Sequence, residues 1–161
     1  MRGQITEEQS YSLVDSLMVE ACKEIMDYAQ PRGVDVVIEA IDRSETNYLK
    51  TAAEVLELIQ KVNCDHLKVH LDTFHMNIEE LDWTEPVLLC GQKLGHVHVA
   101  DNTRLYPGSG MIDFIPFLKA LRTVHYNRSL VMEIYPGKDG FRSCLLGKEY
   151  LMECFKAIAD N

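Results

Sequence analysis

The feature that most limits the possible folds is an alternation of short strand-like segments with longer helix-like segments. The strand-like segments are apolar and rich in β-branched residues, whereas the helix-like segments repeat apolar residues at helical spacing. We predict strands over residues 34–40, 66–71, 95–100 and 130–135, and helices over residues 5–30, 46–62, 79–94, 114–123 and about 148–159. This order is typical of βαβ units and predicts a parallel sheet.

The ends of two predicted helices carry recognisable signals. Thr6 and Gln9 have the spacing of a capping box, with Thr6 as the N-cap of the first helix, and Pro31-Arg32-Gly33 ends that helix. In the helix predicted over residues 79–94, Pro86 lies early, where proline is tolerated.

The chain length limits how much of a barrel can form. A complete TIM barrel needs roughly 200 to 250 residues, whereas this chain has 161, enough for one domain over residues 1–161 with a sizeable core. Four parallel strands with their helices make about half of an eight-stranded barrel. The predicted fold class is therefore α/β, a partial TIM (β/α) barrel.

Composition excludes several classes of function. The formal net charge of −9 disfavours binding to nucleic acid. No apolar run approaches the ~20 residues of a membrane span, and no signal peptide opens the chain, so we expect neither a membrane nor a secreted location. The five cysteines are odd in number, irregularly spaced and without a CxxC pair, which indicates reduced thiols in a cytoplasmic protein.

Polar residues lie at or just beyond the carboxyl ends of the four predicted strands, where parallel α/β folds gather their functional groups. These residues are Glu39, Asp72, His98 and Glu133. Three carboxylates and one imidazole suit a divalent cation such as Mn²⁺, Mg²⁺, Co²⁺ or Zn²⁺. Each residue alone is more often a salt-bridged or core group, but four on successive strands favour a site, because unpaired charges inside a barrel are costly.

Several segments resemble motifs of one enzyme family. Residues 71–80, Leu-Asp-Thr-Phe-His-Met-Asn-Ile-Glu-Glu, are similar to a signature of the ketose 3-epimerases, the D-tagatose and D-psicose 3-epimerase group of the xylose-isomerase-like barrels. Residues 38–45, 95–98 with 102–104 and 107–110, and 131–133 resemble three further motifs, in family order. The resemblance runs from about residue 33 to the end and marks the chain as the C-terminal part of such a barrel. Ala100-Asp101 stands where family members often carry Gly-Glu.

The resemblance implies roles for individual residues. Glu39, Asp72, His98 and Glu133 would hold the metal, with Mn²⁺ as the first expectation, and Glu39 and Glu133 would also be the acid/base pair. Glu45, His75 and Arg104 would bind the sugar hydroxyls. His96 lies on the same strand face as His98 and is expected to pack or to support the site rather than to bind metal.

The chemistry fits these roles. Removing the proton next to a ketone builds charge on the carbonyl oxygen, which a bound metal stabilises, and inversion of the carbon needs a proton acceptor on one face and a donor on the other. We therefore expect an isomerase that epimerises a ketose. The alternatives are a hydroxypyruvate isomerase, a sugar-phosphate epimerase with Arg2 and Gly3 near the phosphate, or a truncated non-catalytic remnant. The superfamily also contains a zinc endonuclease, which the acidic charge disfavours.

The start of the chain raises the question of assembly. Met1-Arg2-Gly3 resembles the end of a fourth barrel strand, so the earlier strands would be missing. An open half-barrel would leave two strand edges unpaired and an apolar inner face exposed. We therefore expect a homodimer or higher oligomer.

Overall fold

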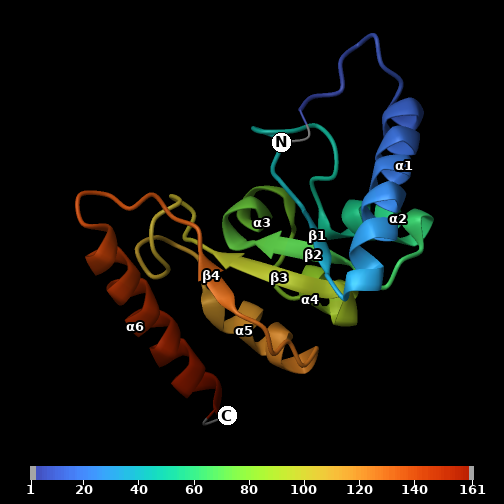
Figure 1. The fold of residues 1–161 in the computed structure, drawn as a ribbon. Helices are drawn as coiled ribbons and strands as arrows, with labels where there is room; N and C mark the ends of the chain where they lie inside the picture. Colours follow the sequence, from blue (N-terminus) through green and yellow to red (C-terminus); the bar gives the residue numbers. More distant parts are fainter. Residues whose placement is uncertain (1–2, 160–161) are drawn as a thin grey trace.

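A sheet of four parallel strands forms the centre of the computed structural model, which describes residues 3–159. The strands are β1 (Val36–Glu39), β2 (Leu67–Asp72), β3 (Leu94–Val99) and β4 (Leu130–Met132), and they lie side by side in chain order (Figure 1). Within the described residues, β1 pairs only with β2, and β4 only with β3. The sheet is therefore open, which confirms the predicted partial α/β barrel.

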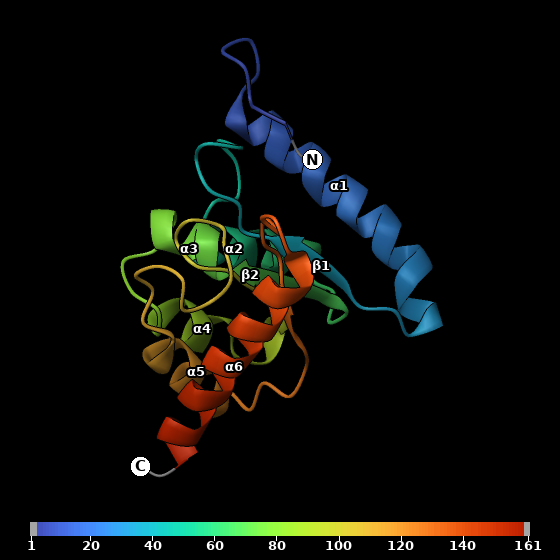
Figure 2. The ribbon, with the colours of Figure 1, turned by 90° about the vertical axis from the view of Figure 1, so that its left-hand side faces the viewer.

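Helices precede, connect and follow the strands, and the row that they form covers one face of the sheet. They are α1 (Tyr11–Ala29), α2 (Ala52–Val62), α3 (Thr73–Glu79), α4 (Glu85–Cys90), α5 (Phe114–Thr123) and α6 (Gly140–Ala159), with short 3-10 turns at Gln30–Arg32 and Gly91–Lys93. Neighbouring helices contact one another in the order α1, α2, α4, α5, α6. Figures 1 and 2 show α1 at one end of this row and α6 at the other.

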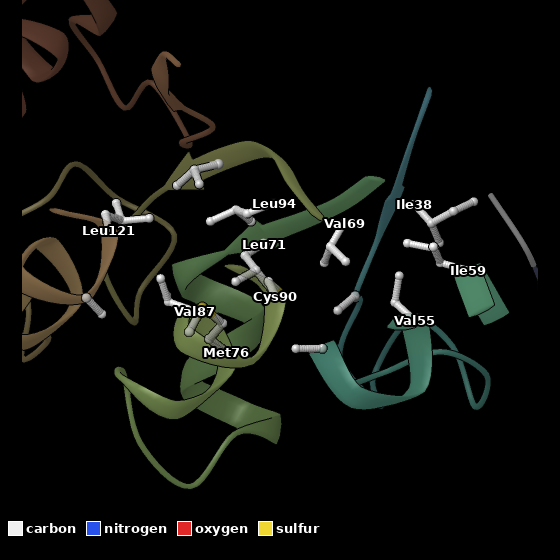
Figure 3. Packing of buried hydrophobic residues seen from close by; sticks show 14 of the residues in the cluster. Ile38, Val55, Ile59, Val69, Leu71, Met76, Val87, Cys90, Leu94 and Leu121 are labelled. Atoms are coloured by element: carbon white, nitrogen blue, oxygen red, sulfur yellow. The ribbon is translucent and has the colours of Figure 1, made fainter. Parts of the chain in front are cut away.

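The hydrophobic core lies between the sheet and the helices. Alternate strand residues such as Val69, Leu71 and Val97 are fully buried there. They meet apolar side chains of the helices, including Val55 of α2 and Val87 of α4 (Figure 3). The period-two alternation of a strand thus sends its apolar residues outward to the helices.

The opposite face of the sheet is largely polar, so the expected apolar inner face is wrong. Alternation places Glu39, His70, Asp72 and His98 on this face, and their polar atoms and rings contact one another there. Val37, two residues before Glu39, is an apolar residue on this same face, and it is 36% exposed. The inner face therefore carries mainly carboxylate and imidazole groups, which can bind ligands or transfer protons, rather than a packed apolar layer.

The first helix begins later than predicted. It starts at Tyr11, and the Oγ of Ser10, not that of Thr6, accepts the capping hydrogen bond from the amide of Leu13. Thr6 and Gln9 instead close a separate turn, in which the Thr6 amide donates to Gln9 Oε1 and the Gln9 amide donates to the Thr6 carbonyl. The Thr6 and Gln9 pattern therefore forms a turn, and the prediction that it starts the first helix is wrong.

Two further helices differ from the prediction at their starts. Helix α2 begins at Ala52 with Thr51 as N-cap rather than at residue 46, because Leu49 is held at φ +59°, which a helix does not allow. Helix α6 begins at Gly140 rather than near residue 148.

The helix predicted over residues 79–94 is wrong in extent. Asp72 accepts from the amide of Phe74 and starts α3 directly after β2. Asp82 Oδ1 then accepts from the amides of Thr84 and Glu85 and starts the short helix α4. Pro86 lies in the first turn of α4, as expected.

Strand β4 ends at Met132 rather than at residue 135, so Glu133 follows the strand. The predicted helix over residues 114–123 and the cores of the other strands agree with the structure. Arg2, considered above for a phosphate contact, lies outside the described residues. Among residues 3–159, no helix is long and apolar enough to cross a bilayer.

Candidate metal and acid–base site

The four predicted ligand residues meet at the carboxyl ends of the strands. Glu39 and Asp72 are the last residues of β1 and β2, and Glu133 follows β4 immediately. His98 lies on β3 as the register partner of Asp72. Because all four strands are parallel, their ends reach the same edge of the sheet, and one side chain from each enters the same space.

One potential ligand atom from each of these four residues lies within 4.8 Å of the others. The Nδ1 atom of His98 is 2.8 Å from Glu133 Oε2, 3.6 Å from Asp72 Oδ2 and 4.0 Å from Glu39 Oε1. The side chain of Asp72 is fully buried, whereas that of Glu133 is half exposed. The site is therefore a cluster of three carboxylates around an imidazole, closed at its base and open at Glu133.

Arg104 also reaches this cluster. Its guanidinium donates to Asp72 Oδ2 and to Glu133 Oε2, both at 2.5 Å. The backbone of Arg104 is left-handed, with φ +60°, an uncommon state for a residue other than glycine. The Arg104 amide donates to the Asp101 carbonyl, and the Tyr135 amide donates to the Arg104 carbonyl, so the loop after β3 and the end of β4 fix this conformation together.

Asp101 organises the loop that carries Arg104. Its fully buried carboxylate accepts hydrogen bonds from the amides of Asn102, Gly108 and Ile112. A Cβ at Gly110 would come within 2.4 Å of Asp101 Oδ1, so the loop folds tightly around this side chain. Asp101, which stands at a departure from the family pattern, therefore serves the loop rather than the cluster.

The environment sets the protonation of the cluster. Burial alone would raise the pKa of Asp72, but the neighbouring His98 imidazole and the hydrogen bonds from Arg104 and the Phe74 amide hold it at about 2. Burial would lower the pKa of His98, yet the neighbouring carboxylate of Asp72 and the hydrogen bond to Glu133 raise it above its ordinary value. Burial, with the nearby charges of Asp72 and Glu133, raises the pKa of Glu39. Glu39 is thus a stronger base than an ordinary glutamate.

Two of the three predicted sugar-binding residues, His75 and Glu45, lie on the side of Glu39 away from the Arg104 contacts with Asp72 and Glu133. His75 Nε2 is 3.8 Å from Glu39 Oε1, and its Nδ1 is 2.6 Å from Asp42 Oδ2. The exposed carboxylate of Glu45 lies within 4.8 Å of the polar atoms of His75 and Asp42. The structure thus places His75 and Glu45 on one flank of the cluster and Arg104 on the other.

Comparisons with known proteins identify the family. A model of the family described as "Xylose isomerase-like TIM barrel" matches residues 2–146. The chain belongs to this family. It is 38% identical over 117 residues to the L-ribulose 3-epimerase of Methylomonas sp. (strain DH-1), and 37% identical over 122 residues to the D-psicose 3-epimerase of Agrobacterium fabrum. These matches cover 73% and 76% of this chain but 41% and 42% of the relatives.

A crystal structure of D-allulose 3-epimerase from Methylomonas sp. superposes with a TM-score of 0.80 at 30% sequence identity, over 88% of this chain and 56% of that one. The chain therefore spans about half or less of the length of the xylose isomerase-like barrels that it resembles. The recognition of the ketose 3-epimerase group from sequence motifs is confirmed by these relatives.

The family motif at residues 71–80 also contributes structural contacts. Glu79, whose side chain is 2% exposed, pairs with the guanidinium of Arg43 at 2.7 Å. Glu80 accepts from the amide of Ala52 at the start of α2. Glu79 thus ties α3 to the loop after β1, and Glu80 ties the end of α3 to the start of α2, so part of the motif is structural.

The donor set of this barrel fits a divalent cation. Three carboxylates and one imidazole from four strands provide the hard oxygen ligands and the single nitrogen that Mn²⁺, Mg²⁺, Co²⁺ or Zn²⁺ accept. Asp72 is ionised because its pKa is held at about 2. His98 must lose a proton before it can bind a metal.

Two polar residues beside the site were missed by the sequence reasoning. His70 lies two residues before Asp72 on β2, so the strand period of two was a signal that it shares the inner face; its Nε2 is 3.8 Å from Glu39 Oε1. Its ring packs edge-to-face against those of His96 and His98, which agrees with packing for His96. Burial, with the charges of His98 and His96, lowers the pKa of His70 to about 3. The second missed residue, Asp42, lies within the motif at residues 38–45, but nothing in the sequence indicated that it contacts His75.

Proposed function

We propose that this chain carries the metal site and the acid/base pair of a ketose 3-epimerase. The observation that supports this most is the convergence of ligand atoms from Glu39, Asp72, His98 and Glu133 within 4.8 Å of one another. The relatives with the names L-ribulose 3-epimerase and D-psicose 3-epimerase support the same reaction class.

Glu39 and Glu133 are the proposed proton acceptor and donor. When bound, the cation would supply a Lewis acid next to the ketone of the sugar. Glu39, whose pKa is raised by burial, removes the proton from the carbon next to the ketone. Glu133, which enters from the opposite edge strand of the sheet, returns a proton to the other face. The roles exchange for the opposite epimer.

The remaining residues position the sugar. Arg104 donates hydrogen bonds and neutralises negative charge on the β4 side of the cluster. His75 and Glu45 lie on the β1 side, where they can accept hydrogen bonds from sugar hydroxyls. A sugar bound between the two flanks would present its reacting carbon to Glu39 and Glu133.

Proton exchange with solvent tests this function. The 161-residue chain is incubated with Mn²⁺ and a panel of ketoses, including D-psicose and L-ribulose, in D₂O. NMR should show deuterium at C3 and formation of the C3 epimer, and Glu133→Gln should abolish both. Asp65→Asn, a change at a 95% exposed side chain paired with Lys93, is the matched control and should leave exchange unchanged.

Other outcomes select other functions. Exchange at C1 or C2 with an aldose product would indicate an aldose–ketose isomerase such as hydroxypyruvate isomerase, and turnover of phosphorylated sugars alone would indicate a sugar-phosphate epimerase. Product without solvent exchange would contradict the two-carboxylate mechanism. Metal binding with no exchange on any sugar would show that this chain is not a catalyst by itself.

A further inference from the structure

Asp42 forms a buried carboxylate–imidazole pair with His75. Asp42 lies in the loop after β1, and its side chain is fully buried; that of His75, on α3, is 5% exposed. The two polar atoms, Asp42 Oδ2 and His75 Nδ1, are 2.6 Å apart. Because burial strengthens such a contact and makes its loss costly, this pair fixes the orientation of the imidazole ring.

The hydrogen bonds around Asp42 determine which nitrogen of His75 carries the proton. A carboxylate oxygen 2.6 Å from a ring nitrogen requires a proton between them, so Nδ1 is the donor. The Asp42 amide also points its N–H at this Nδ1, but at 3.4 Å that contact is long and weaker than the 2.6 Å contact with the carboxylate. Hydrogen bonds from Ser44 and His75 also outweigh burial and lower the pKa of Asp42, so the carboxylate is ionised.

The other oxygen of Asp42 is fixed by Ser44. Asp42 Oδ1 accepts from the Ser44 amide at 2.7 Å and from the Ser44 hydroxyl at 2.5 Å. A backbone amide can only donate, so Oδ1 must stay an acceptor. The carboxylate therefore cannot rotate away from His75 without losing two hydrogen bonds.

We propose that Asp42 is a positioning residue that holds His75 in the Nδ1–H tautomer, so that an unprotonated Nε2 faces the substrate. The Nε2 atom lies 3.8 Å from Glu39 Oε1, at the edge of the cluster. It would accept a hydrogen bond from a sugar hydroxyl held next to the proposed base. The role toward substrate rests on the proposed function, whereas the tautomer does not.

The tautomer can be measured on the chain itself. In long-range ¹H–¹⁵N NMR spectra of the ¹⁵N-histidine-labelled chain at mildly alkaline pH, the His75 ring should show a protonated Nδ1 and a bare Nε2. His75→Gln identifies its signals among those of the six histidines. A His75 ring that is protonated on Nε2, or on both nitrogens, would overturn the proposal without any variant of Asp42.

Asp42→Asn should reverse the tautomer. The Ser44 amide requires the asparagine oxygen on its own side, so the asparagine NH₂ group faces His75 and donates to Nδ1. The proton must then move to Nε2. An unchanged tautomer in a folded Asp42→Asn chain would contradict the proposal.

A second carboxylate–histidine pair supplies a matched control. His66 Nδ1 lies 2.8 Å from Asp35 Oδ1 at the start of the sheet, away from the cluster, and both side chains are part exposed. Asp35→Asn should alter the His66 signals and leave those of His75 unchanged. A change at His75 in this control would show that the signals report general loosening of the fold.

A double-mutant cycle tests the role in turnover, in any preparation that exchanges the ketose proton. Asp42→Asn should lower kcat/KM by about 10- to 100-fold, the range typical of supporting carboxylates. In a His75→Gln background the same change should have almost no further effect, because Asp42 acts through His75. Additive losses would contradict the positioning role, and the NMR result stands apart from whether the chain is an epimerase.

Discussion

Arg104 occupies the most informative position in the cluster, because it contacts two of the four predicted metal ligands. Its guanidinium pairs with Asp72 and Glu133 through two short hydrogen bonds. The same positive charge must repel a divalent cation that uses those two carboxylates. Arg104 therefore has opposite effects on metal binding and on the binding of a negatively polarised oxygen.

We predict that Arg104→Gln binds Mn²⁺ about 10-fold more tightly, since it removes a like charge from a part-buried site. Calorimetry measures the affinity. Arg128→Gln is the matched control, because Arg128 pairs with Asp35 outside the cluster. Weaker Mn²⁺ binding in Arg104→Gln would show that the guanidinium organises the ligands rather than competing with the cation.

His98 makes metal binding depend on pH. The pKa of His98 is raised above 6.5, so its proton stabilises the metal-free fold below that pH and this contribution is lost as pH rises through the folded-state pKa. A metal needs the neutral imidazole. Affinity for Mn²⁺ should therefore increase from about pH 6 to about pH 8, with proton release on binding. Calorimetry in buffers of different ionisation enthalpy measures that proton, and a constant affinity would contradict the assignment.

The sequence predicts the residues of the cluster better than their surroundings. Glu39, Asp72 and Glu133 could be placed because each lies at or just beyond the end of a short strand-like segment, and parallel strand ends converge. Asp42 could not be placed, because its contact with His75 is a tertiary one between residues 33 apart in the sequence. The ion pairs of Arg104 could not be predicted either, because they depend on a left-handed backbone conformation that no local sequence pattern indicates.

Among the secondary-structure elements, strands and helix interiors follow from the sequence more closely than helix ends. Tyr48 and Leu49 are buried loop residues, and their apolar side chains led to the prediction that α2 begins before Ala52. Gly140 and Gly147 suggest breaks, yet both lie within α6. Tertiary contacts decide these boundaries, and local propensity does not.

The start of α1 gives a test of this kind. Ser10→Ala should destabilise the chain by about 1 kcal/mol, because Ser10 Oγ caps the amide of Leu13. Thr6→Ala is the control and should change the free energy of unfolding far less, because Thr6 bonds through its backbone. Urea unfolding measures both. A larger loss of unfolding free energy in Thr6→Ala would indicate that Thr6, and not Ser10, caps the first helix.

At the scale of the whole molecule, the described residues present open sheet edges and apolar helix surfaces. Within residues 3–159, β1 and β4 each lack a second strand neighbour. The end helices α1 and α6 expose large apolar side chains, which are Tyr11, Leu13, Leu17, Ile25, Tyr28, Phe141, Leu145, Leu146, Met152 and Phe155. Exposed edges and patches of this kind favour association.

We therefore predict that the purified chain forms a homodimer or a higher oligomer at micromolar concentration. Sedimentation velocity measures the assembly. Because the inner face is polar and carries the cluster, we expect the apolar faces of α1 and α6 to contribute to the interface, and Leu17→Lys with Phe155→Lys should weaken it. A cooperative monomer would show that the open sheet is stable by itself.

The proposed metal site is tested most directly by titrating Mn²⁺ into the metal-free chain. Four ligand groups from four strands should bind one equivalent, and Glu133→Gln and His98→Ala should each weaken the affinity at least 10-fold, as loss of a ligand requires. Asp65→Asn, with its exposed carboxylate paired to Lys93, should bind as the parent does. Unchanged affinity in both ligand variants would contradict the site, and with it the proposed epimerase chemistry.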